Sequence, residues 1–205
     1  MVVKIKNADI IDYQRPDDLP EHLGGHHGTT QMDHGALDWA IQTLHPQSFL
    51  DIGCGTGRMV RLAADQGLTA MGIDGDGTVD RKGAQCRIHD FNTGPINMAY
   101  RYDLGYCVEF LEHVEEKFIP NFMPAFLSCK YVIVTYAPPG TPGPHHVNCQ
   151  VEQYWIDTFT GYGFDYSWPQ THQLRVFSTM NIDRPILKRY IKNNGLFFEN
   201  PSLTI

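Results

Sequence analysis

The sequence lacks any apolar run that approaches the roughly 20 residues of a membrane-spanning helix. Its first residues lack the apolar core and cleavage site of a secretory signal peptide. The five cysteines are odd in number and form no C-x-x-C pair, so a disulfide framework is not indicated. Reduced thiols are the simplest interpretation, and we expect a cytoplasmic protein with no membrane partner.

Basic residues are also few, because 16 Lys and Arg stand against 23 Asp and Glu and give a net charge of −7. They are scattered along the chain, which leaves no basic stripe for a phosphate backbone and makes a nucleic-acid partner the less favoured one. Hydrophobic residues make up 42% of the 205 residues, which is ordinary for a globular protein. We therefore predict a single domain over residues 1–205, with a core of its own.

Three glycines at alternate positions end the stretch FLDIGCGTG, at residues 49–57. A short apolar run that stops at glycines and is followed by a helical pattern predicts a buried strand, a tight turn and a helix. Gly53, Gly55 and Gly57 allow positive φ angles and the close approach of a ligand. Asp74 ends the next apolar run, at roughly the 20-residue spacing of a carboxylate that binds ribose hydroxyls. This pattern is typical of a site for a nucleotide cofactor.

The order D-x-G-x-G-x-G, with Asp51 before the first glycine, resembles motif I of the class I S-adenosylmethionine-dependent methyltransferases. Dinucleotide oxidoreductases more often space their last two glycines as G-x-x-G, which seats a pyrophosphate at a helix N-terminus. S-adenosylmethionine has no phosphate, so the spacing favours this cofactor. The resemblance covers about residues 48–177. An NAD-dependent dehydrogenase and a non-catalytic cofactor-binding module stay open as alternatives.

The resemblance assigns cofactor-binding roles to residues that follow successive strands. It implies that Asp51 and the glycine turn hold the methionine portion, Asp74 the ribose, and Asp90 with Phe91 the adenine. Taken alone, Asp90 is equally well explained as a cap of the turn after its strand. The predicted cofactor-binding residues are Asp51, Gly53, Cys54, Gly55, Gly57, Asp74, Gly75, Asp90, Phe91 and Glu109.

Strands and helices alternate from residue 49 onward. This alternation predicts an α/β fold, Rossmann-like as in the class I methyltransferases, with a mainly parallel seven-stranded sheet and helices on both faces. We expect strands at residues 49–52, 68–73, 86–89, 103–108, 131–135, 164–168 and 174–177, the last two forming a closing antiparallel hairpin. We expect helices at residues 35–44 (capped by Asp33), 58–66, 115–128 (interrupted by Pro120 and Pro124), 148–161 (capped by Asn148) and 184–194.

These elements divide the chain into an irregular arm at residues 1–34, a catalytic core at residues 35–180, and a helix and tail at residues 181–205. The arm is rich in Pro, Gly and His, and is either a surface segment or a lid that contacts the substrate. Its histidines are candidates for a pocket over the cofactor: His22, His26, His27 and His34.

Glu109, Glu112 and His113 form the motif E-x-x-E-H after the expected fourth strand, and His146 follows the next strand. The motif resembles two branches of the family, the small-RNA 3′-terminal 2′-O-methyltransferases and the ubiquinone-biosynthesis O-methyltransferases. In those enzymes the corresponding E-x-x-E-H and, in the RNA enzymes, a later histidine hold a divalent cation. This implies Glu109, Glu112 and His113 as metal ligands here, with His146, or its neighbour His145, as the later histidine. Two carboxylates with imidazoles suit Mg²⁺, Mn²⁺, Co²⁺ or Zn²⁺.

The same L-E-H pattern is common in class I methyltransferases that bind no metal. His113 and His146 are therefore equally candidates for catalytic residues that position the acceptor or take its proton without a metal. We predict methylation of a hydroxyl group on a small molecule or glycan, with metal-dependent RNA 2′-O-methylation as the second interpretation.

Overall fold

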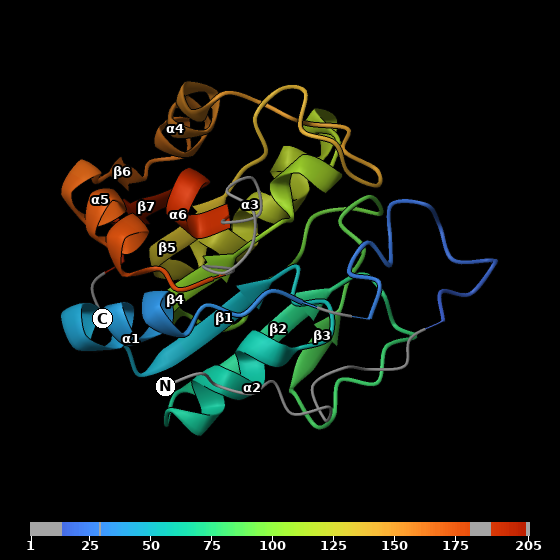
Figure 1. The fold of residues 1–205 in the computed structure, drawn as a ribbon, viewed down its shortest axis with the longest axis horizontal. Coiled ribbons are helices and arrows are strands. Elements are labelled where there is room, and N and C mark those ends of the chain that lie inside the picture. The colour runs from blue at the N-terminus through green and yellow to red at the C-terminus, as the bar shows by residue number, and fades with distance from the viewer. Residues whose placement is uncertain (1–13, 29, 181–189, 204–205) are drawn as a thin grey trace.

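The computed structural model describes residues 14–28, 30–180 and 190–203. It has a seven-stranded sheet in the order β3-β2-β1-β4-β5-β7-β6 (Figure 1). The strands are β1 (Ser48–Ile52), β2 (Thr69–Asp74), β3 (Cys86–Ile88), β4 (Tyr102–Cys107), β5 (Cys129–Thr135), β6 (Asp165–Tyr166) and β7 (Gly195–Glu199). The first five are mutually parallel, and β7 pairs antiparallel with both β5 and β6. The predicted mainly parallel sheet is confirmed.

Helices cover both faces of this sheet. They are α1 (His34–Leu44), α2 (Arg58–Asp65), α3 (Ile119–Leu127), α4 (Glu152–Gly161), α5 (Trp168–Phe177) and α6 (Tyr190–Asn194). Two 3₁₀ turns, η2 (Leu111–His113) and η3 (Glu116–Phe118), precede α3. Buried side chains of α3 and α4 form one core with the sheet, and those of α1, α2, α5 and α6 form the other. In the described part of the chain, no helix is long and apolar enough to cross a membrane.

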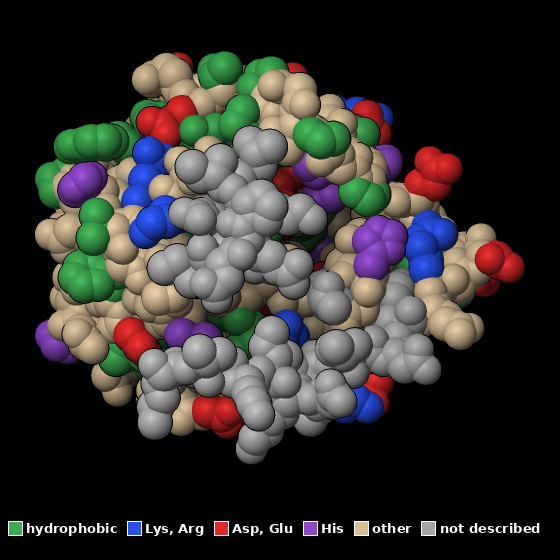
Figure 2. Space-filling view, in the orientation of Figure 1, with side chains coloured by type: hydrophobic (Ala, Val, Ile, Leu, Met, Phe, Trp, Pro, Cys, Tyr) green, Lys and Arg blue, Asp and Glu red, His purple; other side chains and the backbone are tan. Residues whose placement is uncertain are grey.

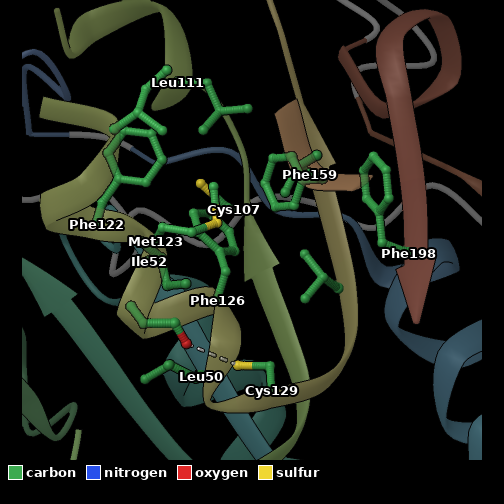
Figure 3. Close-up of a cluster of buried hydrophobic side chains, with 14 of the residues drawn as sticks. Leu50, Ile52, Cys107, Leu111, Phe122, Met123, Phe126, Cys129, Phe159 and Phe198 are labelled. Carbon is green, nitrogen blue, oxygen red and sulfur yellow. Dashed lines mark hydrogen bonds between the residues drawn. The ribbon is translucent and has the colours of Figure 1, made fainter. Parts of the chain in front are cut away.

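Aromatic rings join the core under α3 and α4 to the C-terminal strand (Figure 3). The ring of Phe159 stacks on that of Phe198, with centroids 4.6 Å apart, and it meets the ring of Phe126 edge-on at 5.1 Å. Offset and edge-on pairs are the favourable arrangements for aromatic rings. The late strand β7 is therefore tied into the same core as the early strands.

One predicted strand of the C-terminal part, residues 174–177, and the predicted closing hairpin are wrong. Residues 174–177 lie in α5, where Leu174 is fully buried while Val176 and Phe177 are more than half exposed. Pro169, in the first helical turn, suits a helix start because its missing N–H is not needed there. The strand that pairs with β6 is β7, from the region predicted as a tail. Because α5 and α6 lie between them, the two strands form no hairpin.

Three predicted helix details also change. Helix α4 begins at Glu152, and Asn148 does not cap it but donates its side-chain amide to the Val114 carbonyl, 3.1 Å away. The predicted interruption falls before α3, which accommodates both prolines: Pro120 in its first turn and Pro124 at the loss of one hydrogen bond. In the tail, α6 and then β7 follow a stretch, residues 181–189, that lies outside the described residues. The predicted Asp33 cap of α1 is confirmed, since its carboxylate accepts the Ala36 N–H at 2.9 Å.

Two matched substitutions test whether the last strand of the sheet is β7 or the predicted strand at residues 174–177. Phe198→Ala should lower the free energy of unfolding by about 3–5 kcal/mol, because it leaves a cavity in the aromatic core. Phe177→Ala removes the same ring from an exposed position and should cost about 0.5 kcal/mol or less. Urea unfolding followed by circular dichroism measures both, and equal losses would contradict the assigned strand.

Candidate active site

A cavity of about 910 Å³ lies beyond the carboxyl ends of the strands. Strands β1 and β4 are neighbours at its base, and at this point the strand order reverses, which is where open α/β sheets bind ligands. The N-terminal arm, blue in Figure 1, lies beyond the arrowheads of β1, β2 and β3. Figure 2 shows the hollow on this face, with histidine and acidic side chains visible inside it.

Most of the predicted site residues line this cavity. Among the predicted cofactor-binding residues these are Asp51, Gly53, Cys54, Gly55, Asp74, Gly75, Asp90, Phe91 and Glu109. The predicted catalytic residues His113 and His146 line it as well. Gly57 and Glu112 do not, since Gly57 precedes α2 and Glu112 is fully buried behind the cavity wall.

The backbone amides of the glycine loop are bonded within the protein. The N–H groups of Gly53 and Cys54 donate to the Ile73 carbonyl at 2.9 and 3.0 Å, and that of Gly55 donates to Asp74 at 2.7 Å. Dinucleotide sites keep such amides free, because they bind the pyrophosphate. The loop therefore suits a cofactor without phosphates.

Gly55 is required because the protein itself packs against it. Its φ angle is 49°, and a Cβ atom there would lie 2.4 Å from the Thr30 methyl carbon and 3.1 Å from His26. The sequence predicts that this glycine makes room for a ligand. In the structure, the arm occupies the space directly over it.

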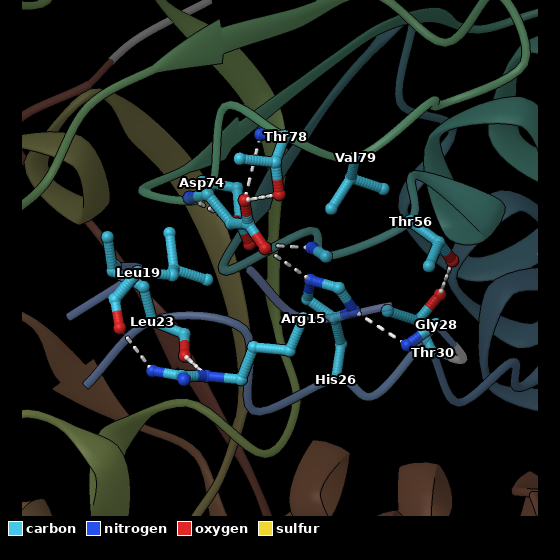
Figure 4. Close-up of polar contacts among 12 residues, drawn as sticks. Arg15, Leu19, Leu23, His26, Gly28, Thr30, Thr56, Asp74, Thr78 and Val79 are labelled. Carbon is cyan, nitrogen blue, oxygen red and sulfur yellow. Dashed lines mark hydrogen bonds and ion pairs between the residues drawn. The ribbon is translucent and has the colours of Figure 1, made fainter. Parts of the chain in front are cut away.

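Asp74 is fixed by contacts on both of its oxygen atoms (Figure 4). Oδ2 accepts the Gly55 N–H, while Oδ1 accepts the Asp76 N–H at 2.8 Å and lies 3.3 Å from an Arg81 Nη. A carboxylate has about four acceptor positions, so Asp74 keeps capacity for a ligand. Its side chain is 13% exposed and reaches the cavity.

Asp90 caps the turn after its strand and lines the cavity, and its contact with adenine stays a prediction. Its Oδ1 accepts the Asn92 N–H at 2.9 Å, as a turn cap does, while Oδ2 lies 3.0 Å from His22 Nε2 in the arm. The next residue, Phe91, is buried and packs edge-on against Phe110 with ring centroids 5.6 Å apart. Asp90 is thus both a turn cap and part of the cavity wall.

The arm is attached to the glycine loop through Thr30 and to the loop after β2 through His26. Nδ1 of His26 accepts the Gly28 N–H at 3.0 Å, so the proton is on Nε2, which lies 3.1 Å from an oxygen of the fully buried Asp76. The hydroxyls of Thr30 and Thr56 add a contact of 2.7 Å. The arm thus covers the loop with a neutral histidine at the contact, and its movement as a lid stays a prediction.

Acid should loosen this attachment. Burial lowers the pKa of His26, and Arg81 acts in the same direction, while Asp74 and Asp76 oppose both. Because the pKa in the folded state lies below the unfolded value of about 6.5, the contact is stable above that pH and weakens as the pH falls below it. Hydrogen exchange of residues 22–28 should therefore be faster at about pH 5.5 than at about pH 7.5, after correction for intrinsic rates.

The control for this effect is His26→Gln, which keeps an amide donor for Asp76 but cannot be protonated. Its hydrogen exchange should lose the difference between the two pH values. Wild-type protection that stays constant across this range would contradict the role of His26.

At the other end of the cavity, Glu112, His113 and His146 form a compact group. One possible ligand atom from each lies within 4.8 Å of the others. Glu112 is fully buried, and neither of its carboxylate oxygens has a hydrogen-bond partner in the described part of the chain. Three of the four predicted metal ligands are thus brought together, and Glu109 is not part of the group.

The loop after β5 is held against this group by its backbone. The N–H groups of Val147 and Asn148 donate to the Glu112 carbonyl at 2.9 and 3.0 Å. His146 Nδ1 lies 3.0 Å from the Thr141 carbonyl, so Nδ1 carries the proton and Nε2 is an acceptor. A histidine oriented in this way by a backbone carbonyl has the usual geometry of a metal ligand or a base.

Burial is the largest cause of the pKa shifts of Glu109, Glu112 and His113. It raises the pKa of Glu109 and of Glu112, and the neighbouring carboxylate raises that of Glu109 further. It lowers the pKa of His113 to about 4, with His146 contributing, so the His113 imidazole is neutral near pH 7. Glu109 has a φ angle of 57°, and such left-handed backbone in a non-glycine residue is common at functional sites.

Sequence reasoning missed Tyr106, which lines the cavity from β4 next to Asp51 in β1. Its position near the end of the expected fourth strand was visible in the sequence, but its pairing with Asp51 was not, because the register of β4 against β1 appears only in the structure. It also missed Tyr190 and Asn194, which reach the cavity from α6.

A family model described as a methyltransferase domain matches residues 26–131, more than half of the chain. The chain belongs to the class I S-adenosylmethionine-dependent methyltransferase family, as its glycine motif predicts. No curated protein sequence is significantly similar to it.

Solved structures with this fold are similar at low sequence identity. An S-adenosylmethionine-dependent methyltransferase from Archaeoglobus fulgidus has 16% identity and a TM-score of 0.51, over 63% of this chain and 66% of that one. The methyltransferase domain of bacterial CtHen1-C has 17% identity and a TM-score of 0.51, over 65% and 84%. Magnesium protoporphyrin IX methyltransferase from Synechocystis, with bound S-adenosylhomocysteine, has 18% identity and a TM-score of 0.50, over 64% and 70%. These similarities show a shared fold.

Proposed function

We propose that the protein transfers a methyl group from S-adenosylmethionine to a hydroxyl of a small-molecule or glycan acceptor. One observation carries this proposal. Acids at the ends of β1 and β2 and just after β3 line the cavity, and Glu109, His113 and His146 line it as well. A cofactor and an acceptor can therefore meet within it.

The residues present fit the cofactor. The buried carboxylate of Asp51 suits an ammonium group, Asp74 suits ribose hydroxyls, and Asp90 with Phe91 suits adenine. The glycine loop, with its amides bonded internally, suits a molecule without phosphates. When bound, S-adenosylmethionine supplies an electrophilic methyl group on a sulfonium centre.

The chain's part in the reaction is to hold the acceptor close and in line and to manage its proton. A hydroxyl must lose its proton as the new bond forms, and a neutral imidazole can receive it. His113 is neutral near pH 7, and His146 has its Nε2 available as an acceptor. We therefore propose these two as the catalytic residues.

The cofactor assignment can be tested by binding. S-adenosylmethionine, and not NAD, should raise the melting temperature of the protein. Asp74→Ala should abolish S-adenosylmethionine binding in calorimetry, because it removes the ribose acceptor and frees the Gly55 amide. Asp80→Ala, an exposed acid in the same loop, is the matched control and should bind normally. Unchanged affinity in Asp74→Ala would refute the site, and stabilisation by NAD alone would favour the dehydrogenase.

As the alternative to a metal-free role of the histidines, we propose that Glu112, His113 and His146 hold a divalent cation, with Glu109 beside them, so that the two imidazoles would be ligands and not proton acceptors. The fit rests on the Glu112 carboxyl, whose oxygens make no hydrogen bond among the described residues and whose pKa is raised by burial, because a divalent cation beside it would stabilise the charged form. A divalent cation there would lower the pKa of the acceptor hydroxyl and orient it.

Metal removal tests this second proposal. Exhaustive chelation should abolish methyl transfer and leave S-adenosylmethionine binding intact, since Asp51, Asp74 and Asp90, which would hold the cofactor, are not part of the metal group. Glu112→Gln keeps about the same side-chain volume but removes the charge. It should lower the metal content measured by mass spectrometry and reduce activity. Full activity after chelation would end the metal hypothesis and leave His113 and His146 acting alone.

RNA 2′-O-methylation is the second candidate, because the same metal group suits it. The net charge of −7 counts against it. Transfer of a labelled methyl group to small-molecule or glycan pools, compared with short RNAs, separates the two. No S-adenosylhomocysteine release with any acceptor would favour a non-catalytic module.

All five cysteines are free, in agreement with the proposed cytoplasmic location.

A further inference from the structure

Tyr106 and Asp51 are direct neighbours in the sheet. In the parallel pair of β1 and β4, Asp51 is in register with Tyr106. Residues in register on adjacent strands point to the same face, so the two side chains leave the sheet together. Both line the cavity at the strand ends.

The Tyr106 hydroxyl is a buried polar group without a partner. The residue is 2% exposed, and its hydroxyl makes no hydrogen bond with any residue that the structure describes. Buried tyrosine hydroxyls normally find a partner, and an exception in a cavity wall points to a ligand. Burial, together with Asp33 and Asp51, raises the pKa of this phenol, which therefore keeps its proton and can donate it.

The two groups offer opposite chemistry to a ligand. Burial and the nearby Asp74 raise the pKa of Asp51, and an ammonium group beside it would favour its charged form, which accepts hydrogen bonds. Tyr106 has an O–H that can donate to an anion. The α-carbon of an amino acid bears both an ammonium and a carboxylate group. A carboxylate beside a hydroxyl donor is complementary to such a zwitterion.

We propose that Tyr106 is a cofactor-binding residue whose hydroxyl donates to the α-carboxylate of the amino-acid end of S-adenosylmethionine, while Asp51 receives the α-ammonium group. The inference rests on the proposed function and extends it. It adds a residue outside the glycine motif that recognises the amino-acid end rather than the nucleoside.

The test compares two ligands that differ only at that end. S-adenosylhomocysteine has the amino-acid group, whereas 5′-methylthioadenosine lacks it. Tyr106→Phe removes one oxygen atom and should weaken S-adenosylhomocysteine binding about tenfold in calorimetry, the effect of one hydrogen bond to a charged group. Its affinity for 5′-methylthioadenosine should stay unchanged. Tyr102→Phe, on the same strand but outside the cavity lining, should bind both ligands as the wild type does.

Two results would overturn the inference while leaving the proposed function in place. One is a Tyr106→Phe variant that binds S-adenosylhomocysteine as tightly as the wild type, and the other is an equal loss for both ligands. Wild-type protein that binds neither ligand would overturn the proposed function and this inference with it.

A second measurement needs no variant. The wild type should bind decarboxylated S-adenosylhomocysteine about tenfold more weakly than the intact ligand, because the hydroxyl then has no carboxylate to bind. Equal affinity for the two would also overturn the inference.

Discussion

The hydrogen bond from the Gly55 N–H to Asp74 is the contact on which the cavity depends. It joins the loop after β1 to the end of β2, and two further amides of that loop donate to the Ile73 carbonyl. With the loop fixed, the arm can pack on Gly55 through Thr30. The same bond fixes the orientation of the Asp74 carboxylate, together with Arg81, which contacts its other oxygen. One short contact thus positions the proposed ribose acceptor, the base of the cavity and its cover.

The part of the fold that holds this contact could be predicted from sequence, because short apolar runs ending in an acid or glycine mark parallel strands clearly. The C-terminal part could not. LRVF and GLFFE are both short apolar runs, and periodicity does not separate a buried strand from a helix turn. Tertiary structure makes the choice. Residues 195–199 fill the position beside β5 and are buried up to Phe198, whereas the first run exposes Val176 and Phe177.

The site shows the same division. Glu112, His113 and His146 were found because the E-x-x-E-H motif resembles that of metal-binding branches of the family. The structure brings them together because loops after parallel strands meet at one edge of the sheet. Tyr106 was not found, because its role depends on the register of β1 against β4, which no local pattern encodes. The contact of the arm with Asp90, through His22, joins residues 68 positions apart and leaves no periodic signal. The sequence also could not distinguish Glu109 from Glu112, of which one lines the cavity and the other lies buried behind it.

The charge of the cavity limits what it can bind. Its described lining includes the acids Glu21, Asp51, Asp74, Asp90 and Glu109 but no lysine, and its single arginine, Arg15, donates to carbonyl groups of the arm. Arg81, behind Asp74, is likewise occupied. Burial raises the pKa of Asp51 and of Glu109, and a cation beside either acid favours its charged form. A pyrophosphate would meet these acids and no lysine in the described lining, and low-dielectric surroundings strengthen both effects. The sulfonium and ammonium groups of S-adenosylmethionine are positively charged, as is a divalent cation, and this cavity favours positive charge. The pyrophosphate of a dinucleotide is negatively charged. The electrostatics therefore lead to the same cofactor as the glycine spacing, by an independent physical route.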